Sequence, residues 1–210
     1  MSYLEDVHSK ETNALLVSLN MDAMNNDVPI ITEEGLRFLR QMICLKDVSH
    51  ILEIGSAIGY SAIAVAMIDT NIKVTTLERD SAMIKETKKN ITQAGLQDRI
   101  TLIDTDALTF DETTLEEPFD MLFIDGAKSQ SIPFFKKYAP LIKKHGIIIV
   151  DNLLFHGFLE DGVKRPANRN TRQLVKKIDT FNRWVLNHKD YDTSIYPIGD
   201  GMSLSIKRID

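Results

Sequence analysis

Short runs of apolar and β-branched residues recur along this chain and alternate with longer segments whose apolar positions have helical spacing. Runs of this length are typical of strands buried on both faces of a parallel sheet. Strands are predicted at residues 51–54, 73–77, 100–103, 119–125 and 147–150. Helices are predicted between them, from Asp80 to Ala94 and from about Ser131 to Lys143, because Gly95 and Gly146 then act as helix stops.

The two ends of the chain complete this pattern. Residues 1–28 carry apolar positions at helical spacing and are expected to form helices that pack on the main body. An amphipathic helix is predicted over 174–186, followed by a hairpin with strands at 194–196 and 202–206. The element order predicts an α/β protein with a doubly wound, mostly parallel seven-stranded sheet that contains one antiparallel strand.

Composition limits the classes of protein to which this chain can belong. With 210 residues, 43% of them hydrophobic, it can bury one sizeable core, so we expect a single domain over residues 1–210. A net charge of −5 gives no overall sign of nucleic-acid binding, and any basic site must be local. Neither a signal-peptide pattern nor an apolar run approaching about 20 residues is present, which predicts a cytoplasmic protein without a membrane span.

The cysteine and histidine content argues against two other kinds of site. Cys44 is the only cysteine, so no intrachain disulfide can form. It lies in an amphipathic helix predicted to begin after Thr32, where a small buried side chain is expected rather than a nucleophile. The five histidines show no paired ligand spacing, which argues against a zinc site.

The first predicted strand leads into a glycine turn with the pattern Glu53-x-Gly55-x-x-x-Gly59. Such a turn places helix N-terminal amides at the carboxyl end of the sheet, where open α/β folds bind their ligands. The spacing differs from the Gly-x-Gly-x-x-Gly of dinucleotide sites, which need close backbone approach at more glycines. S-adenosylmethionine has no phosphate, and a carboxylate such as Glu53 suits its ammonium and sulfonium groups. The alternative is an ordinary βα turn without a ligand.

Acidic and amide side chains follow other predicted strands. Glu78 comes directly after the second strand, where an acid can accept both hydroxyls of a ribose. Asp125 is the last residue of the strand at 119–125, and Asp151 and Asn152 follow the strand at 147–150. These three oxygen donors are expected to converge, and hard oxygen ligands suit Mg²⁺ better than Zn²⁺. Each residue alone could instead be a cap or turn residue, so the metal prediction depends on their joint occurrence.

The run ILEIGSAIGYSAIAVA, from Ile51 to Ala66, resembles the first motif of the catechol and caffeoyl-CoA O-methyltransferase family. The resemblance covers nearly the whole chain and implies a Rossmann-like methyltransferase fold, S-adenosylmethionine, a divalent cation and a homodimer. It also implies that a segment with Ile31 and Thr32 closes over the methionine end of the cofactor and that Asp106 and Ala107 contact the adenine. The expected cofactor-binding residues are Ile31, Thr32, Glu53, Gly55, Tyr60, Ser61, Glu78, Asp106, Ala107 and Asp125.

The expected chemistry is methyl transfer from S-adenosylmethionine to an oxygen. Asp125 and Lys128 form an Asp-x-x-Lys pattern and are the predicted catalytic residues, while Asp125, Asp151 and Asn152 are expected to hold Mg²⁺ or another divalent cation. Such an ion can chelate a hydroxyl beside a second oxygen and favour the oxyanion. Lys128 could assist proton removal or only orient the acceptor, and both roles stay open.

One local basic cluster consists of Lys164, Arg165, Arg169 and Arg172. Within the family, the tail from residue 151 to 208 is most similar to the bacterial tRNA wobble 5-hydroxyuridine methyltransferases. This implies that the product is 5-methoxyuridine, and we hypothesise that the basic cluster contacts a tRNA anticodon loop. The alternative for the cluster is a set of solvated loop charges without a partner. In 5-hydroxyuridine a hydroxyl lies next to the O4 carbonyl, as in a catechol. The alternatives are a small catechol-like phenol or caffeoyl-CoA-like acceptor, or a binding protein without activity.

Overall fold

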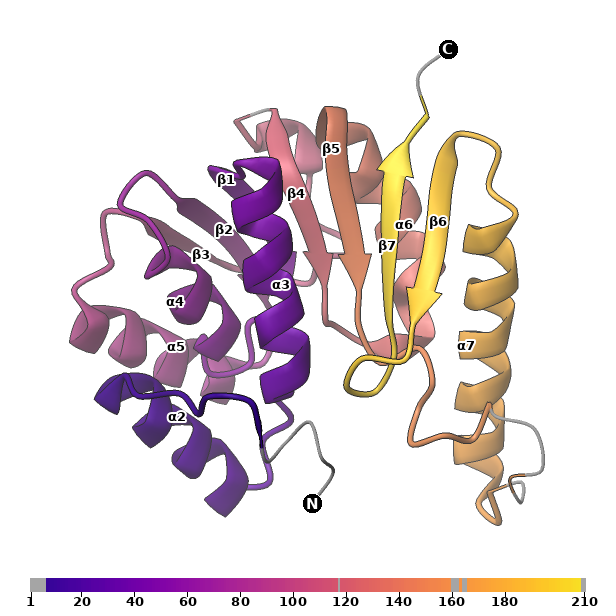
Figure 1. Cartoon of the computed structure of the whole chain (residues 1–210), viewed down its shortest axis with the longest axis horizontal. Coiled ribbons are helices and arrows are strands. Elements are labelled where there is room, and N and C mark those ends of the chain that lie inside the picture. The colour runs from indigo at the N-terminus through magenta and orange to yellow at the C-terminus, as the bar shows by residue number, and fades with distance from the viewer. Residues whose placement is uncertain (1–6, 117, 160–162, 164–165, 209–210) are drawn as a thin grey trace.

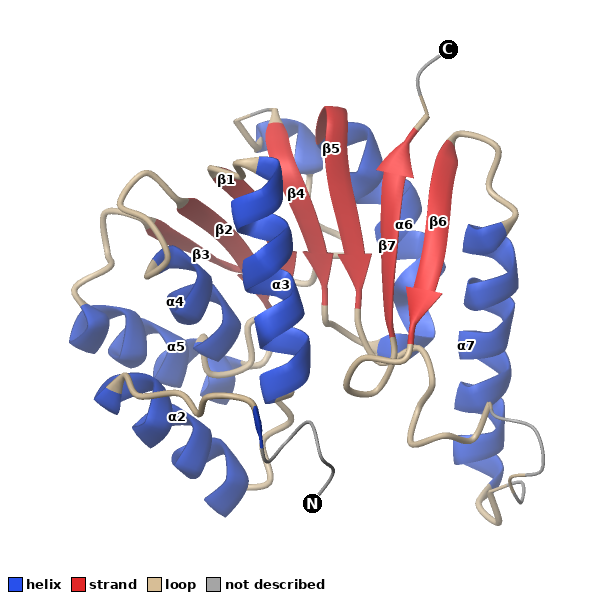
Figure 2. Cartoon of the chain, viewed as in Figure 1, coloured by secondary structure: helices blue, strands red, loops and turns tan. Residues whose placement is uncertain are grey.

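A sheet of seven strands runs through the middle of the molecule and carries helices on both faces (Figure 1, Figure 2). The computed structural model describes residues 7–116, 118–159, 163 and 166–208. The strands are β1 His50–Ile54, β2 Lys73–Glu78, β3 Ile100–Asp104, β4 Phe119–Ile124, β5 Ile142–Val150, β6 Tyr191–Tyr196 and β7 Met202–Lys207. Their order across the sheet is β3-β2-β1-β4-β5-β7-β6. Only β7 runs antiparallel to its neighbours, β5 and β6, which confirms the predicted sheet.

Side chains alternate between the two faces of the central strands, and each face has its own set of helices. In β4, Met121 and Phe123 pack in one hydrophobic core, and Leu122 and Ile124 pack in the other. The first core includes residues of α2 Ala14–Asn25, α3 Glu33–Lys46, α4 Tyr60–Ala66 and α5 Ser81–Ala94. The second includes residues of α6 Ser131–Tyr138 and α7 Arg169–Leu186. Among the described residues, no helix combines the length and the apolar character that a membrane crossing requires.

The boundary between α6 and β5 differs from the prediction. The helix was expected to reach about Lys143, but it ends at Tyr138, and after a 3₁₀ turn, η3 (Ala139–Leu141), β5 begins at residue 142. Pro140 lies in this turn and lacks the amide hydrogen that a continuing α-helix needs. Gly146 lies within β5, where a Cβ atom would come within 2.7 Å of the Asp120 carbonyl oxygen. This glycine therefore permits a close approach of two strands and does not stop a helix.

Helix α3 confirms one prediction and corrects another. Thr32 is its N-cap, and the Thr32 Oγ1 accepts a hydrogen bond of 3.1 Å from the amide of Gly35. The predicted burial of Cys44 was wrong, because this side chain is exposed. The buried face of the helix includes Leu39 and Ile43, and position 44 lies about 100° further round the helix axis.

Asp120, the second residue of β4, connects the amino ends of β4 and β1. Its Oδ2 accepts hydrogen bonds from Ser49 N, Ser49 Oγ and His50 N at 2.7, 2.9 and 2.8 Å. Its Oδ1 forms an ion pair with Lys143. Burial by itself would raise the pKa of this carboxyl, but Lys143 and the three hydrogen bonds outweigh burial and lower the pKa to about 2.

Replacing Asp120 by Ala should destabilise the protein by roughly 2 to 4 kcal/mol at pH 7, because two partly buried backbone amides and a lysine lose their acceptor. Asp120→Asn is the matched control. Its amide oxygen can still accept hydrogen bonds from Ser49 and His50, so it should lose less stability than Asp120→Ala. The folded pKa lies below the unfolded value of about 3.9, so the stabilisation is present above about pH 4 and is lost as the pH falls toward 2. Urea unfolding at pH 7 and pH 3 measures both effects. Equal stability of Asp120→Ala and wild type at pH 7 would contradict this role.

Candidate active site

A cavity of about 350 Å³ lies at the carboxyl ends of β1, β2 and β4. The sheet order reverses beside β1, and open α/β sheets bind ligands at such a point. The residues that line the cavity are Val28, Pro29, Ile30, Ile54, Gly55, Ala57, Leu77, Glu78, Arg79, Met83, Thr105, Asp106, Ala107, Leu108, Asp125, Gly126, Ala127, Lys128, Gln130, Phe134 and Asn152. Residues predicted from the sequence therefore meet around one space from the ends of five strands, β1 to β5.

The glycine turn after β1 forms the floor of the cavity. Gly55 has a φ of +94°, and a Cβ atom there would lie 2.9 Å from both the Asp125 carbonyl oxygen and the Gly126 Cα. The Gly55 amide donates to the Leu77 carbonyl at 2.9 Å, so the turn fits between the ends of β2 and β4. Only a residue without a side chain allows both the backbone conformation and this close approach.

Glu53 and Ser61 lie beneath this floor and do not line the cavity. The buried carboxylate of Glu53 accepts hydrogen bonds from Ser61 Oγ and Thr76 Oγ1, both at 2.5 Å. Burial raises the pKa of Glu53 to about 7, although the two hydroxyl donors act in the opposite direction. Glu53 therefore links β1, β2 and the first turn of α4. It would influence a ligand in the cavity only indirectly, through its charge and through the position of the glycine turn.

Glu78, at the end of β2, lines the cavity and is held by backbone amides. Its Oε1 accepts hydrogen bonds from Arg79 N and Asp80 N at 2.8 and 2.9 Å, and its Oε2 accepts one from Ala57 N at 3.1 Å. A carboxylate has about four acceptor sites, so Glu78 keeps capacity for a ligand hydroxyl. The Glu78 carboxylate is therefore oriented by backbone amides from two segments, the turn after β1 and the residues after β2.

Asp106, Ala107 and Leu108 form the opposite wall, after β3. The Asp106 Oδ1 accepts a hydrogen bond from Leu108 N at 2.9 Å, and its Oδ2 accepts one from the Arg79 guanidinium at 3.1 Å. These contacts lower the pKa of Asp106, the hydrogen bond from Leu108 having the largest effect. The wall therefore presents small and apolar side chains beside an ionised carboxylate.

Asp125, Asp151 and Asn152 converge from the ends of β4 and β5, as predicted. The side-chain Nδ2 of Asn152 donates to the Asp125 Oδ1 at 2.8 Å, and the backbone amide of Asn152 donates to the Asp151 Oδ1 at 2.6 Å. Burial, followed by the charge of Asp151, raises the pKa of Asp125 well above its usual range. Burial also raises the pKa of Asp151 to about 6. Two buried carboxylates thus lie close together, and the charge of Lys128 compensates them only in part.

This group of oxygens has the chemistry of a divalent-cation site. Carboxylate and amide oxygens are the ligands of Mg²⁺ and Ca²⁺, and a cation would compensate the two buried negative charges. The residues present therefore fit a hard cation. Among the described residues, however, no cluster holds three His, Cys, Asp or Glu side chains in a metal-binding arrangement, so a cation here would depend on the Asn152 amide oxygen as a third ligand.

Lys128, from the 3₁₀ turn η2 (Lys128–Gln130), occupies the middle of this polar group. Its Nζ donates to the Asn152 Oδ1 at 2.6 Å and lies 5.1 Å from the centre of the Phe155 ring. It also lies 3.9 Å from the Asp200 Oδ2, a buried atom without a hydrogen-bond partner among the described residues. Asp200, which sequence analysis did not select, comes from the turn between β6 and β7. Figure 1 shows this turn beside the carboxyl ends of β4 and β5.

Five of the ten predicted cofactor residues do not line the cavity, namely Glu53 and Ser61, described above, and Ile31, Thr32 and Tyr60. Ile31 is buried in the first hydrophobic core, and Thr32 caps α3, whereas Ile30 lines the cavity with the two residues before it. Ile31 and Thr32 directly follow these lining residues, and their contact with a cofactor stays a prediction. Tyr60 is 1% exposed and lines a separate cavity of about 170 Å³ beside Arg40.

Other lining residues were not predicted, because only their position at the start of a helix, and no motif, marks them. Met83 lies in the first turn of α5 after β2, and Phe134 lies in the first turn of α6 after β4. The start of a helix that follows a strand end faces the ligand edge of such a sheet, and this rule would have selected both.

The predicted basic cluster is described only in part. Lys164 and Arg165 lie outside the described residues. Arg169 is exposed at the start of α7, and Figure 1 shows this end of the helix at the edge of the sheet where the parallel strands end. Arg172 donates hydrogen bonds to the Pro166 and Ala167 carbonyls at 3.1 and 2.5 Å, so it holds the preceding loop.

Comparison with known proteins is consistent with this geometry. Residues 6–208 match the sequence profile of the family described as O-methyltransferase. A catechol O-methyltransferase of Niastella koreensis is 29% identical over 97% of this chain and 94% of its own length. A Staphylococcus aureus structure, provisionally assigned as a caffeoyl-CoA O-methyltransferase, is 40% identical with a TM-score of 0.91 and covers 98% of both chains. An O-methyltransferase of Bacillus cereus, solved in complex with SAH, is 24% identical with a TM-score of 0.81 and covers 98% of this chain and 96% of its own.

The match over most of the chain confirms the resemblance found in the glycine-turn motif. The fold, the position of that turn and the relatives agree with one another. This chain therefore belongs to the O-methyltransferase family, with relatives of the catechol and caffeoyl-CoA type.

Proposed function

We propose that this protein transfers a methyl group from S-adenosylmethionine to a hydroxyl oxygen with the help of a divalent cation. The observation that carries this proposal is the division of one cavity into two ends. At one end Gly55, Glu78 and Ala107 offer a carboxylate beside small and apolar walls. At the other end Asp125, Asn152 and Lys128 gather oxygen ligands and an ammonium group.

The first end suits the adenosine part of S-adenosylmethionine. The fixed carboxylate of Glu78 can accept hydrogen bonds from ribose hydroxyls, and the wall at Ala107 and Leu108 can pack against an adenine ring. The family assignment supports this cofactor, and so does the complex of the Bacillus cereus relative with SAH. Gly55 lets the turn after β1 lie directly against residues 125 and 126, so that backbone from two strand ends borders the same cavity.

The second end suits a cation and the acceptor. Asp125, Asp151 and Asn152 would hold the ion, which when bound supplies Lewis acidity and a template for an acceptor whose hydroxyl lies beside a second oxygen. Lys128 Nζ lies at the same place, where as an ammonium it would orient the acceptor oxygen and as a neutral amine it would take up the acceptor's proton. Asp200 restrains Lys128 from the side of the β6–β7 turn. Alignment of the acceptor oxygen with the methyl group then supplies much of the rate.

For the acceptor we propose 5-hydroxyuridine at the wobble position of a tRNA. This nucleoside offers a hydroxyl next to the O4 carbonyl, and a base in a single-stranded loop can leave its stack to enter a pocket. The similarity of the tail and the exposed Arg169 at the start of α7 support a nucleic-acid acceptor. The second candidate is a small catechol or caffeoyl-CoA-like molecule, which is favoured by the Niastella koreensis relative that covers almost the whole chain.

Methylation of bulk tRNA from a strain that lacks the gene, followed by nucleoside mass spectrometry, separates these acceptors. We expect tRNA methylation to fall with salt, with a log–log slope of about −0.7 for each single-strand phosphate contacted, whereas methylation of a catechol should show almost no slope. Arg169→Glu should weaken tRNA methylation on the order of tenfold. Arg183→Glu, an exposed reversal near the other end of α7, is the matched control. If Arg169→Glu methylates tRNA normally at physiological salt, the basic cluster is not the RNA contact and the small acceptor becomes the better assignment.

A further inference from the structure

The wall of the cavity at Ala107 and Leu108 belongs to an irregular loop between β3 and β4. Within the loop, Thr109 N and Phe110 N donate to the Asp106 carbonyl, both at 3.0 Å, and form a single tight turn. These local bonds shape the turn but do not attach it to the rest of the molecule. The position of the wall relative to the cavity must come from other contacts.

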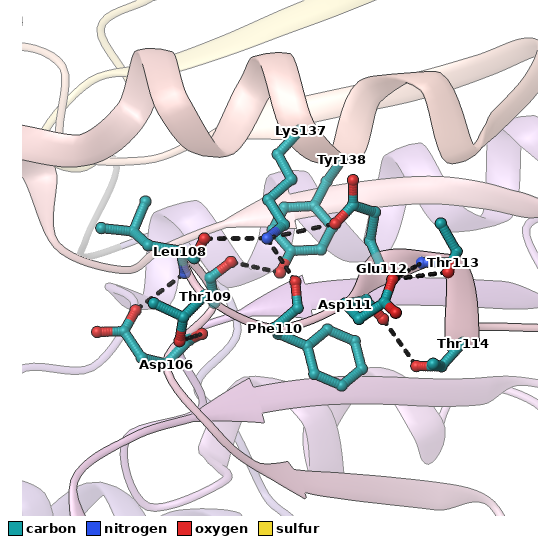
Figure 3. A network of polar contacts seen from close by, with 11 residues as sticks. Asp106, Leu108, Thr109, Phe110, Asp111, Glu112, Thr113, Thr114, Lys137 and Tyr138 are labelled. Carbon is teal, nitrogen blue, oxygen red and sulfur yellow. Dashed lines mark hydrogen bonds and ion pairs between the residues drawn. The ribbon is translucent and has the colours of Figure 1, made fainter.

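Two neighbouring side chains at the end of α6 supply those contacts (Figure 3). The Tyr138 hydroxyl donates to the Ala107 carbonyl at 2.6 Å. The Lys137 Nζ donates to the Leu108 and Phe110 carbonyls at 3.0 and 2.5 Å. Three of four consecutive carbonyls in the loop are therefore bound by one helix.

Burial and charge make this attachment firm. Tyr138 is 0% exposed, and the Lys137 side chain is 18% exposed. The Lys137 Nζ also forms an ion pair with Glu112 at 3.3 Å, which fixes the ammonium at the far end of the loop. An ammonium donor makes stronger hydrogen bonds to carbonyls than a neutral donor does.

Helix α6 also lines the cavity directly. It follows the turn that carries Lys128, and Phe134 in its first turn contributes to the wall. The same short helix thus lies between the acceptor end of the cavity and the loop at the adenosine end. Because a helix is a rigid element, α6 sets the separation between the two ends of the cavity.

From these contacts we propose that Lys137 and Tyr138 are positioning residues for S-adenosylmethionine, which hold the adenine-facing wall at the separation that the cofactor requires. Neither residue lines the cavity, so neither is a catalytic residue. The proposal rests on the proposed function, since it assumes that the adenosine lies against Ala107 and Leu108. Its consequence is that these residues determine cofactor affinity and leave the chemical step nearly unchanged.

The test uses Lys137→Met and Tyr138→Phe, which remove the donors and keep most of the side-chain volume. Titration calorimetry with S-adenosylhomocysteine should show binding weaker by on the order of tenfold in each variant. The KM for S-adenosylmethionine should rise by a similar factor, and kcat at saturation should stay within about threefold of wild type. Lys137→Arg, which keeps a charged donor, should recover part of the affinity.

Matched controls exist on the same side of the sheet. Lys136→Met removes an exposed lysine next in sequence, which lies over the Trp184 ring and not at the loop. Tyr191→Phe removes the hydroxyl of another buried tyrosine in the same hydrophobic core. Both controls should bind S-adenosylhomocysteine as wild type does.

The outcomes separate the two proposals. Unchanged affinity in both Lys137→Met and Tyr138→Phe, with wild type binding normally, overturns the positioning role and leaves the proposed function standing. A loss of melting temperature with unchanged affinity for each folded molecule also overturns it, because it shows a purely structural role. Failure of wild type to bind either S-adenosylmethionine or S-adenosylhomocysteine overturns the proposed function itself.

Discussion

Asp151→Asn should lower methyl transfer by at least about 100-fold and, at the same time, raise the melting temperature of the metal-free protein. Activity falls because the variant removes one of two carboxylate ligands, and even the loss of a residue that only hydrogen-bonds to a metal ligand alters activity by roughly 10- to 100-fold. Stability rises because burial raises the pKa of Asp151 to about 6, so its ionised form destabilises the fold at pH 7. The destabilisation is absent below about pH 4, where the carboxyl is protonated in both states. Activity assays and thermal unfolding at pH 7 measure the two effects.

A cation titration distinguishes a metal site from a pair of catalytic acids. In wild type, Mg²⁺ at about 100 times its Kd should stabilise the fold by about 2.7 kcal/mol relative to EDTA, which corresponds to a shift of several degrees. Asp151→Asn should show little shift, while the exposed control Asp192→Asn should respond as wild type does. Undiminished activity of wild type in EDTA, or an equal Mg²⁺ shift in Asp151→Asn, would refute the cation site.

Gly55→Ala should destabilise the protein by roughly 3 kcal/mol or more and remove cofactor binding. The added Cβ would lie 2.9 Å from backbone atoms of residues 125 and 126, which cannot move without shifting the end of β4. The φ of +94° adds strain that an alanine tolerates poorly. Because Asp125 is one of these residues, the shift also displaces a proposed metal ligand.

Gly95→Ala is the matched control for this prediction. Gly95 also has a positive φ, of +67°, but a Cβ atom there would meet nothing within 4 Å. Gly95→Ala should lower the free energy of unfolding by only about 1 kcal/mol, through backbone strain, and should keep full cofactor affinity. Chemical unfolding and calorimetry with S-adenosylhomocysteine measure both variants. Similar losses in Gly55→Ala and Gly95→Ala would mean that the close approach of the two turns has no effect beyond backbone strain.

Several features of this protein follow from the sequence alone. Short apolar runs mark strands, and the carboxyl ends of parallel strands share one edge, so the convergence of Asp125, Asp151 and Asn152 could be predicted without coordinates. The glycine pattern at residues 53–59 likewise predicted the turn at the floor of the cavity. These features depend on local periodicity and on one rule of topology.

Other features were decided only by the tertiary structure. Asp200 reaches Lys128 because β7 pairs with β5, and Lys137 and Tyr138 reach the loop at 107–110 because α6 packs beside it. Ile30 rather than Ile31 faces the cavity because α3 packs on the sheet in one particular orientation. Side chains about 30 to 70 positions apart in sequence have no shared periodicity, so only the packing of the elements determines which of them meet.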